Sequence, residues 1–260
     1  MDKSHLGPTA SNSYVVGAES VDMTRAHVPV RRAELKAQPQ SIAIDLNRTA
    51  VVVVDMQNDF CAPGGWFDSL GVPVAAIHPI YPRIKAVTDS ARALNVPVIW
   101  LGFGTRPDRA NLAPITRYPF ARVGGGVGLG DSITGRGRSE PHNILEKGSW
   151  GAEVVPELGA RPTDIHVDKH RISGFWDTPL DSILRQHDIK TVAFLGVNSD
   201  ECVFATLIDG SFHGYDTIMI EDGCATSSPA SCHEAALYQV RFCFGFTVTS
   251  QDWTSALKSV

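Results

Sequence analysis

Residues Thr191-Val-Ala-Phe-Leu-Gly-Val-Asn-Ser-Asp-Glu-Cys202 indicate the fold class, because they join a continuous apolar run to the start of a helical segment. Residues 191–196 have the composition of a buried strand, and residues 203–213 that of a helix. In open α/β sheets, ligands bind at the carboxyl ends of such strands. The backbone N–H groups and the dipole of a helix start favour the thiolate form of Cys202. The alternative is that Cys202 is a small buried core residue.

The same alternation of apolar runs and amphipathic segments occurs on both sides of this stretch, from Thr49 onward. Continuous runs of Val, Ile, Leu and Phe suit strands that are buried on both faces. We therefore predict strands at residues 50–55, 97–103, 164–168, 191–196, 217–221 and 245–248. The predicted helices lie at residues 80–94, 152–158, 179–187, 203–213 and 229–242. Right-handed crossovers then give an α/β fold, a three-layer α/β/α sandwich around a mostly parallel six-stranded sheet.

Two segments fall outside this alternation. Residues 1–47 are polar and lack sustained periodicity, so this N-terminal arm is either disordered or packed across a subunit interface, and the domain proper spans residues 48–260. Residues 104–145 are rich in Gly, Pro and Arg, which favours a substrate-covering loop. The glycine run at residues 124–130 does not satisfy G-x-G-x-x-G and follows no strand, so it does not indicate a nucleotide site.

Composition narrows the classes of function. The 260 residues are 43% hydrophobic, which is enough for one sizeable core. A net charge of −5 without a basic cluster argues against a nucleic-acid partner. The sequence has no apolar run of about 18 residues and no leader pattern in residues 1–30, so we expect no membrane contact and a cytoplasmic location. An odd number of cysteines without C-x-x-C spacing indicates reduced thiols: Cys61, Cys202, Cys224, Cys232 and Cys243.

Three residues with suitable chemistry follow predicted strands. Asp55 closes the run Val51-Val-Val-Val-Asp55, Lys169 follows Ile165-His-Val-Asp168, and Cys202 follows the strand at 191–196. The carboxyl ends of parallel strands meet at one edge of the sheet, where these side chains can converge. Asp55 would then take the thiol proton, and Lys169 would stabilise both negative charges. The alternatives are a turn residue for Asp55 and a solvated surface residue for Lys169.

Three motifs in the same order resemble those of the isochorismatase-like cysteine hydrolases. They are Val54-Asp-Met-Gln-Asn-Asp-Phe60 with Gly64-Gly65, Lys169-x-Arg-x-Ser-x-Phe175 with Thr178-x-Leu180, and Gly196-Val-Asn-Ser-Asp-Glu-Cys-Val203. The resemblance implies a catalytic triad of Asp55, Lys169 and Cys202 and a cis peptide bond between Val197 and Asn198. It also implies an oxyanion hole formed by the backbone N–H groups of Asn198 and Cys202. Two departures are the pair Asn198-Ser199 and Glu201, which stands where an apolar residue is usual.

The resemblance also restricts the reaction. Members that cleave a vinyl ether lack the cysteine, so Cys202 implies amide hydrolysis. Members of the nicotinamidase branch carry Asp-x-His after the second strand, but here that place reads Trp100-Leu-Gly-Phe-Gly-Thr-Arg106. We therefore expect no catalytic metal and no cofactor.

The substrate expected from the resemblance is a small linear ureide. Residues 145–150 and 169–184 are similar to ureidoacrylate amidohydrolases, whereas residues 106–112 and 154–158 are similar to biuret hydrolases. Biuret or triuret is favoured over ureidoacrylate or an N-carbamoyl amino acid.

Four residues are candidates for holding this substrate. Phe60, Trp150 and Phe175 would wall a planar substrate and Arg106 would orient it, unless they only pack in the core or hold a loop. The resemblance further implies a homo-oligomer, a tetramer, with the arm at an interface. A non-hydrolytic redox-sensing thiol protein on the same fold is the alternative of another class.

Overall fold

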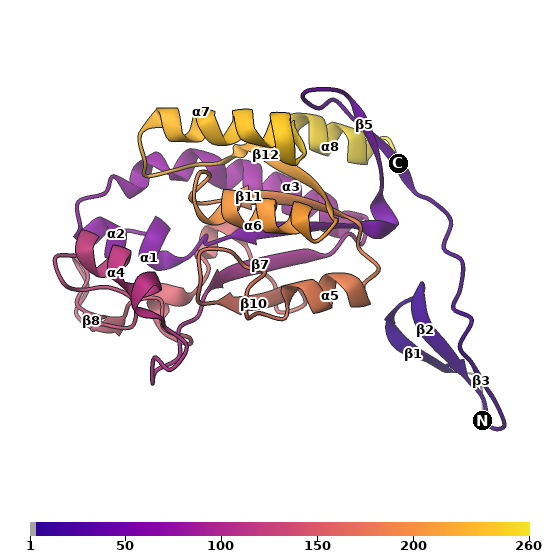
Figure 1. Ribbon diagram of the computed structural model, residues 1–260, viewed down its shortest axis with the longest axis horizontal. Helices are drawn as coiled ribbons and strands as arrows, with labels where there is room; N and C mark the ends of the chain where they lie inside the picture. Colours follow the sequence, from indigo (N-terminus) through magenta and orange to yellow (C-terminus); the bar gives the residue numbers. More distant parts are fainter. Residues whose placement is uncertain (1–3) are drawn as a thin grey trace.

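The computed structural model describes residues 4–260 and has a central sheet with helices on both sides (Figure 1). The sheet has six strands in the order β10-β7-β6-β11-β12-β13, and every neighbouring pair is parallel. The predicted three-layer α/β fold is therefore confirmed. The strands are β6 (Thr49–Val54), β7 (Val98–Phe103), β10 (Ile165–Lys169), β11 (Thr191–Gly196), β12 (Asp216–Cys224) and β13 (Phe246–Val248).

Strands β6 and β11 lie side by side in the middle of the sheet, and all of their residues are buried. The register pairs Thr191 with Thr49 and Gly196 with Val54, so the two strands end at the same level. Because the strands are parallel, the segments that follow Val54 and Gly196 begin at one edge of the sheet.

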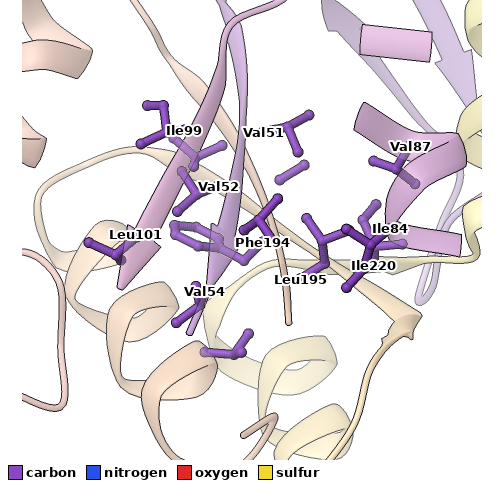
Figure 2. Close-up of a cluster of buried hydrophobic side chains, with 14 of the residues drawn as sticks. Val51, Val52, Val54, Ile84, Val87, Ile99, Leu101, Phe194, Leu195 and Ile220 are labelled. Carbon is purple, nitrogen blue, oxygen red and sulfur yellow. The ribbon is translucent and has the colours of Figure 1, made fainter. Parts of the chain in front are cut away.

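Helices cover both faces of the sheet. Helices α3 and α8 pack together on one face, and α5 and α6 lie on the other (Figure 1). Figure 2 shows Ile84 and Val87 of α3 on the side of Val51, with Val52 on the opposite side, as the two-residue repeat of a strand requires. The longer helices are α3 (Tyr81–Ala93), α4 (Pro114–Val123), α5 (Leu180–Gln186), α6 (Cys202–Phe212), α7 (Ala230–Gln239) and α8 (Ser250–Lys258).

Shorter elements complete the domain. Within residues 4–260, no helix is long and apolar enough to cross a membrane. The short helices are α1 (Asn58–Cys61), α2 (Trp66–Ser69), the 3-10 turns at Leu46–Arg48, Val74–Ala76, His78–Ile80, Trp150–Ala152 and Pro156–Leu158, and a π-helix at Val240–Phe244.

The predicted helix at residues 152–158 is wrong. The chain there forms two separate 3-10 turns, and the backbone N–H of Val155 donates to the carbonyl of Met56 at 3.0 Å. Pro156 has no N–H to continue a helix, so pairing with the segment after β6 takes precedence over local propensity. Residues 104–145 are also not a loop throughout, because they contain α4 and the two-stranded pair β8 (Ser132–Ile133) and β9 (His142–Asn143).

The N-terminal arm contains five short strands within residues 4–47, while residues 23–31 lie in neither a helix nor a strand. Strands β1 (Ser4–Thr9), β2 (Asn12–Val16) and β3 (Val21–Asp22) form an antiparallel sheet that projects from the body (Figure 1). The side chain of Asn12 anchors it by donating to the carbonyl of Gln186 at 2.8 Å. Strands β4 (Arg32–Leu35) and β5 (Ile42–Asp45) pair with each other, and β4 contacts α8. A role of the arm at a subunit interface stays a prediction.

Candidate active site

The structure brings Asp55, Lys169 and Cys202 together from three different segments. Asp55 follows β6, Lys169 ends β10, and Cys202 begins α6 after β11. The Nζ atom of Lys169 lies 2.9 Å from Oδ2 of Asp55, and both side chains are buried. Cys202 and Asp55 line the same cavity, and the charge of the carboxylate acts on the thiol.

The local backbone fixes the position of the Asp55 carboxylate. Asp55 has a left-handed φ of +51°, which Asp tolerates better than most residues, and its N–H donates to the carbonyl of Leu101 at 2.8 Å. Gln57 anchors the next turn to β7, because its side chain donates to the Phe103 carbonyl at 2.7 Å and accepts from the Phe103 N–H at 2.8 Å. A Cβ at Gly102 would lie 2.7 Å from the Gln57 amide carbon, so this contact requires glycine there.

Lys169 reaches Asp55 from a strand that is not its neighbour. Strand β7 lies between β10 and β6, and Lys169 is in register with Phe103 of β7. The Lys169 Nζ atom lies 3.6 Å from the centre of the Phe103 ring and donates to the carbonyl of Arg171 at 3.1 Å. The aromatic face and the carbonyl therefore help to hold the ammonium group against Asp55.

Burial controls the protonation of the pair formed by Asp55 and Cys202. Burial raises the pKa of the Cys202 thiol, the negative charge of Asp55 raises it further, and Lys169 opposes this rise. The resting protein therefore favours the thiol, contrary to the expectation from the helix start alone. Burial also raises the pKa of Asp55, although Lys169 and the thiol lower it. A raised carboxyl pKa makes Asp55 a stronger base than an exposed aspartate.

Cys202 faces a small cavity, here called the inner cavity. Its volume is about 270 Å³, and its lining residues are Asp55, Phe60, Phe67, Phe120, Val197, Asn198, Glu201 and Cys202. A wider outer cavity of about 1240 Å³ adjoins it and shares Phe67, Phe120, Asn198 and Glu201. The nucleophilic sulfur, the carboxylate and three aromatic rings therefore surround one space, as in a small-molecule site.

The loop before α6 presents backbone to the inner cavity. The peptide bond between Val197 and Asn198 is cis, and the Asn198 carbonyl accepts from the N–H of Val203 at 3.1 Å. The Asn198 side chain donates to Glu201 Oε2 at 3.0 Å and to Ser227 Oγ at 3.2 Å. Because Cys202 is the first residue of α6, its N–H has no carbonyl partner inside the helix. This N–H is available to a ligand in the cavity.

Of the four residues predicted to contact substrate, only Phe60 lines the inner cavity. Phe175 instead stacks on the His213 ring, with ring centres 5.0 Å apart, and is a core residue next to α6. Arg106 pairs with Asp108 at 2.6 Å on the surface. Neither therefore lies where sequence reasoning expected it.

Trp150 is also outside the inner cavity. Its indole ring lies against the guanidinium of Arg138, 3.6 Å from the ring centre, and its carbonyl accepts from Asn58 at 2.8 Å. Its role is therefore to hold the chain beside α1.

Sequence reasoning missed two aromatic residues that line the inner cavity. Phe67 comes two residues after Gly65 of the first motif, and Phe120 lies in α4. Two features of the sequence could have indicated these residues. Phe67 closely follows the glycine pair of the first motif, and Phe120 lies in the segment 104–145 that was predicted to cover the substrate. Among residues 4–260, no group of three His, Cys, Asp or Glu side chains is placed to hold a metal ion.

Comparison with known proteins gives consistent matches. Residues 49–252 match the family described as the isochorismatase domain. A cysteine hydrolase from Pseudomonas syringae pv. phaseolicola 1448A is 27% identical, with a TM-score of 0.68 over 83% of this chain and 95% of that one. An N-carbamoylsarcosine amidase from Thermoplasma acidophilum is 26% identical, with a TM-score of 0.56 over 78% of this chain and 96% of that one. An isochorismatase-like hydrolase from Alkaliphilus metalliredigens is 25% identical, with a TM-score of 0.61 over 80% and 98%.

Proposed function

The chain belongs to the isochorismatase family, and from this premise we propose that it is a cysteine-dependent amidohydrolase that cleaves a ureido C–N bond of a small linear ureide. One observation carries the proposal. The ion pair of Lys169 and Asp55 is buried and 2.9 Å long, and its carboxylate lines the same cavity as the Cys202 thiol. A base, a cation and a nucleophile in one desolvated site are the parts that acyl transfer needs.

The first half of the reaction forms a covalent intermediate. Asp55 takes the proton of the Cys202 thiol as the sulfur attacks the ureido carbonyl carbon, forming an S–C bond. The N–H groups of Asn198 and Cys202 donate to the developing oxyanion. Collapse of this intermediate breaks the C–N bond, and Asp55 gives its proton to the departing nitrogen, which leaves as ammonia.

The second half releases the product. A water molecule gives a proton to Asp55 while its oxygen attacks the thioester carbon, and collapse of this intermediate breaks the S–C bond. The proton returns from Asp55 to the Cys202 sulfur, so the enzyme ends as it began. Lys169 keeps Asp55 anionic between these transfers because its charge lowers the carboxyl pKa.

The walls of the inner cavity support a small planar substrate. The rings of Phe60, Phe67 and Phe120 offer flat apolar surfaces beside the Cys202 thiol. Biuret and triuret fit this description, and the sequence resemblance favours them. An N-carbamoyl amino acid or ureidoacrylate is the second candidate, supported by the similarity to an N-carbamoylsarcosine amidase.

Ammonia release tests the proposal directly. The purified protein is expected to release ammonia from biuret, triuret or an N-carbamoyl acid, and Cys202→Ser is expected to lose this activity. Cys224→Ser is the matched control, because Cys224 is buried but does not line the inner cavity. Undiminished activity in Cys202→Ser would contradict the hydrolase. Absence of release from every ureide, together with reversible oxidation of Cys202, would favour the redox-sensing alternative.

We also propose that the chain forms a homo-oligomer, a tetramer, and acts in the cytoplasm. Large exposed apolar side chains on α6, α7 and the π-helix that follows α7 support association, since Phe212, Tyr238 and Phe242 are 74%, 60% and 73% exposed. Five free cysteines suit a reducing compartment. Sedimentation analysis tests the assembly, and a monomer at micromolar concentration would contradict it.

A further inference from the structure

The ionised groups on the cavity walls are all acidic. Asp55 and Glu201 line the inner cavity, and Asp200 and Glu201 line the outer one. Within residues 4–260, no Lys or Arg lines either cavity. Lys169 lies behind Asp55, fully buried, and its charge is opposed by that carboxylate at 2.9 Å. A ligand in these cavities therefore meets uncompensated negative charge at Glu201.

Glu201 is held in place at the junction of the two cavities. It directly precedes α6 and is the neighbour of Cys202 in the chain. Its Oε2 accepts from the Asn198 side chain at 3.0 Å, and the amide of Asn198 is itself held by Ser227 on both sides. Within the described part of the chain, Glu201 Oε1 has no hydrogen-bond partner, so this acceptor is free for a ligand.

We propose that Glu201 determines substrate charge, by accepting a hydrogen bond from an N–H₂ group of the ureide and by repelling substrates that carry a carboxylate. This inference depends on the proposed function, because it names the class of ureide that the Cys202 site takes. A terminal amide group can donate to the free Oε1 atom, whereas a carboxylate cannot donate and adds a second negative charge nearby. The selected class is a neutral ureide with amide groups at both ends.

A matched pair of substrates isolates this effect. N-carbamoylglycinamide and N-carbamoylglycine have the same skeleton and differ in whether the far end is an amide or a carboxylate. We expect the wild-type kcat/KM to favour the amide by about tenfold to a hundredfold, the range that one nearby like charge produces. In Glu201→Gln, which keeps the side-chain size, this ratio should fall at least tenfold, mainly through KM.

Asp200→Asn is the control variant. Asp200 is the adjacent residue, carries the same charge and lines only the outer cavity, where Thr226 donates to it. If position rather than total charge matters, Asp200→Asn should change the ratio less than threefold. An equal fall in both variants would overturn the role of Glu201 and indicate a general field effect.

The outcomes separate this inference from the proposed function. If Cys202-dependent hydrolysis occurs but the wild type prefers N-carbamoylglycine, or if Glu201→Gln leaves the ratio unchanged, the specificity role is wrong and the hydrolase stands. If neither compound, nor biuret or triuret, releases ammonia in a Cys202-dependent manner, the proposed function fails and the inference fails with it.

Discussion

The ammonium nitrogen of Lys169 lies 2.9 Å from the Asp55 carboxylate, and the two side chains are 0% and 2% exposed. They come from β10 and the end of β6, with β7 between them. The pair therefore ties two non-adjacent strands at the edge of the sheet where Cys202 begins α6. Two charges so deeply buried are costly to desolvate, so neither is tolerated without the other. Catalysis and stability are linked at this pair.

Replacing Lys169 with Met is expected to lower both activity and stability. Removal of one partner of a buried ion pair typically costs about 3–5 kcal/mol, because the other charge stays buried without compensation. Loss of the cation also leaves less Asp55 in the ionised form that accepts the thiol proton, so kcat/KM should fall roughly 10²- to 10⁴-fold. Urea unfolding and ammonia release measure the two effects.

The double variant Asp55→Asn with Lys169→Met tests the coupling of the two residues. Its loss in the free energy of unfolding should be smaller than the sum of the losses in the two single variants. Strict additivity would contradict direct coupling.

The pH dependence of activity should reveal the burial of Asp55. Burial raises the pKa of this carboxyl above its usual value of 3.8, and the reaction requires the ionised form. Activity is therefore lost as pH falls through this raised pKa, so the acid limb of kcat/KM should lie above pH 3.8. In Lys169→Met the opposing charge is absent, and the limb of the residual activity should move to higher pH. A limb that moves to lower pH would show that Asp55 is not the titrating base.

Alkylation of Cys202 should become faster in a variant that loses hydrolysis. The negative charge of Asp55 raises the pKa of the thiol, so Asp55→Asn should increase the thiolate fraction while abolishing hydrolysis. We expect iodoacetamide to modify Cys202 faster in Asp55→Asn at pH 7, because a lower thiol pKa gives a larger thiolate fraction. Cys224 is the internal control, because burial raises its pKa to about 12. Slower alkylation of Cys202 in the variant would contradict the protonated resting state.

A second buried carboxylate, that of Asp59, should hold the segment that covers the site in its folded conformation. Asp59 is 0% exposed and accepts from the N–H groups of Trp66 at 3.0 Å and Leu145 at 2.8 Å and from His142 Nε2 at 2.6 Å. Asp59→Ala leaves these donors buried without an acceptor, which should cost about 3 kcal/mol in the free energy of unfolding. Hydrogen exchange near residues 142–145 should accelerate.

The matched control for this change is Asp108→Ala in the same segment. Asp108 is 53% exposed, and among residues 4–260 it pairs only with Arg106 and nearby backbone at the surface. Exposed ion pairs contribute about 0–1 kcal/mol, so hydrogen exchange near residues 142–145 should stay as in the wild type. Equal acceleration in both variants would rule out a specific role of Asp59.

The central sheet was predictable because its strands carry their own signal. The run at residues 50–55 is apolar without interruption, and Asp55 marks its end as a strand-to-loop boundary. Parallel geometry then predicts, from the sequence alone, that Asp55, Lys169 and Cys202 lie at one edge of the sheet. The last helix, α8, was missed although Thr249 caps it by accepting from the Asp252 N–H, a local signal present in the sequence.

The walls of the site could not be predicted in the same way. Phe120 reaches the inner cavity because α4 folds back over the sheet edge, and the order of residues 104–145 depends on long-range bonds such as that between Asp59 and His142. Phe175 and Phe60 are both phenylalanines within the motifs that resemble the family, yet Phe175 stacks on His213 in the core. Aromatic identity alone does not separate a cavity wall from a packed interior.

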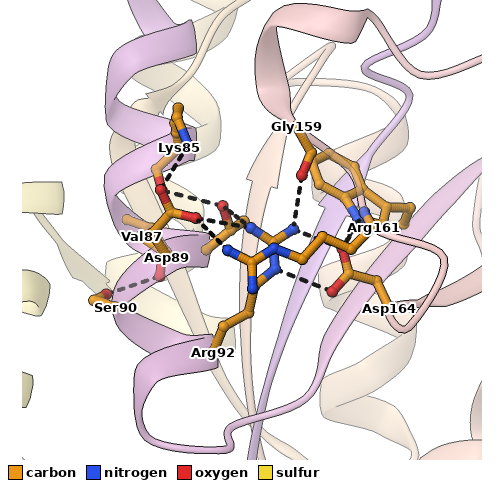
Figure 3. Close-up of polar contacts among 10 residues, drawn as sticks. Lys85, Val87, Asp89, Ser90, Arg92, Gly159, Arg161 and Asp164 are labelled. Carbon is orange, nitrogen blue, oxygen red and sulfur yellow. Dashed lines mark hydrogen bonds and ion pairs between the residues drawn. The ribbon is translucent and has the colours of Figure 1, made fainter.

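A cluster of ionised side chains far from the site should stabilise the fold through one nearly buried pair. Figure 3 shows Arg92 of α3 between Asp89 and Asp164. Arg92 and Asp164 are 9% and 4% exposed and 2.6 Å apart, and Asp164 also accepts from the Trp100 indole at 2.8 Å. We expect Asp164→Ala to cost about 3 kcal/mol at pH 7, because it leaves the guanidinium and the indole without their acceptor.

The pH dependence of this loss has a defined sign. Burial alone would raise the pKa of Asp164, but the bonds from Arg92, Trp100 and the Arg161 N–H outweigh it and hold the pKa below its usual value. Stability from a carboxyl with a lowered pKa is complete above its unfolded pKa, near 4, and is lost as pH falls through the folded pKa. The difference in unfolding free energy between wild type and Asp164→Ala should therefore be constant from pH 5 to 7 and shrink below about pH 4.

Lys85→Ala is the control variant. Lys85 pairs with Asp89, and the two side chains are 51% and 39% exposed, so this ion pair should contribute less than about 1 kcal/mol at any pH. A gap between wild type and Asp164→Ala that widens in acid would show that the carboxyl is protonated in the folded protein and that Arg92 does not hold it ionised.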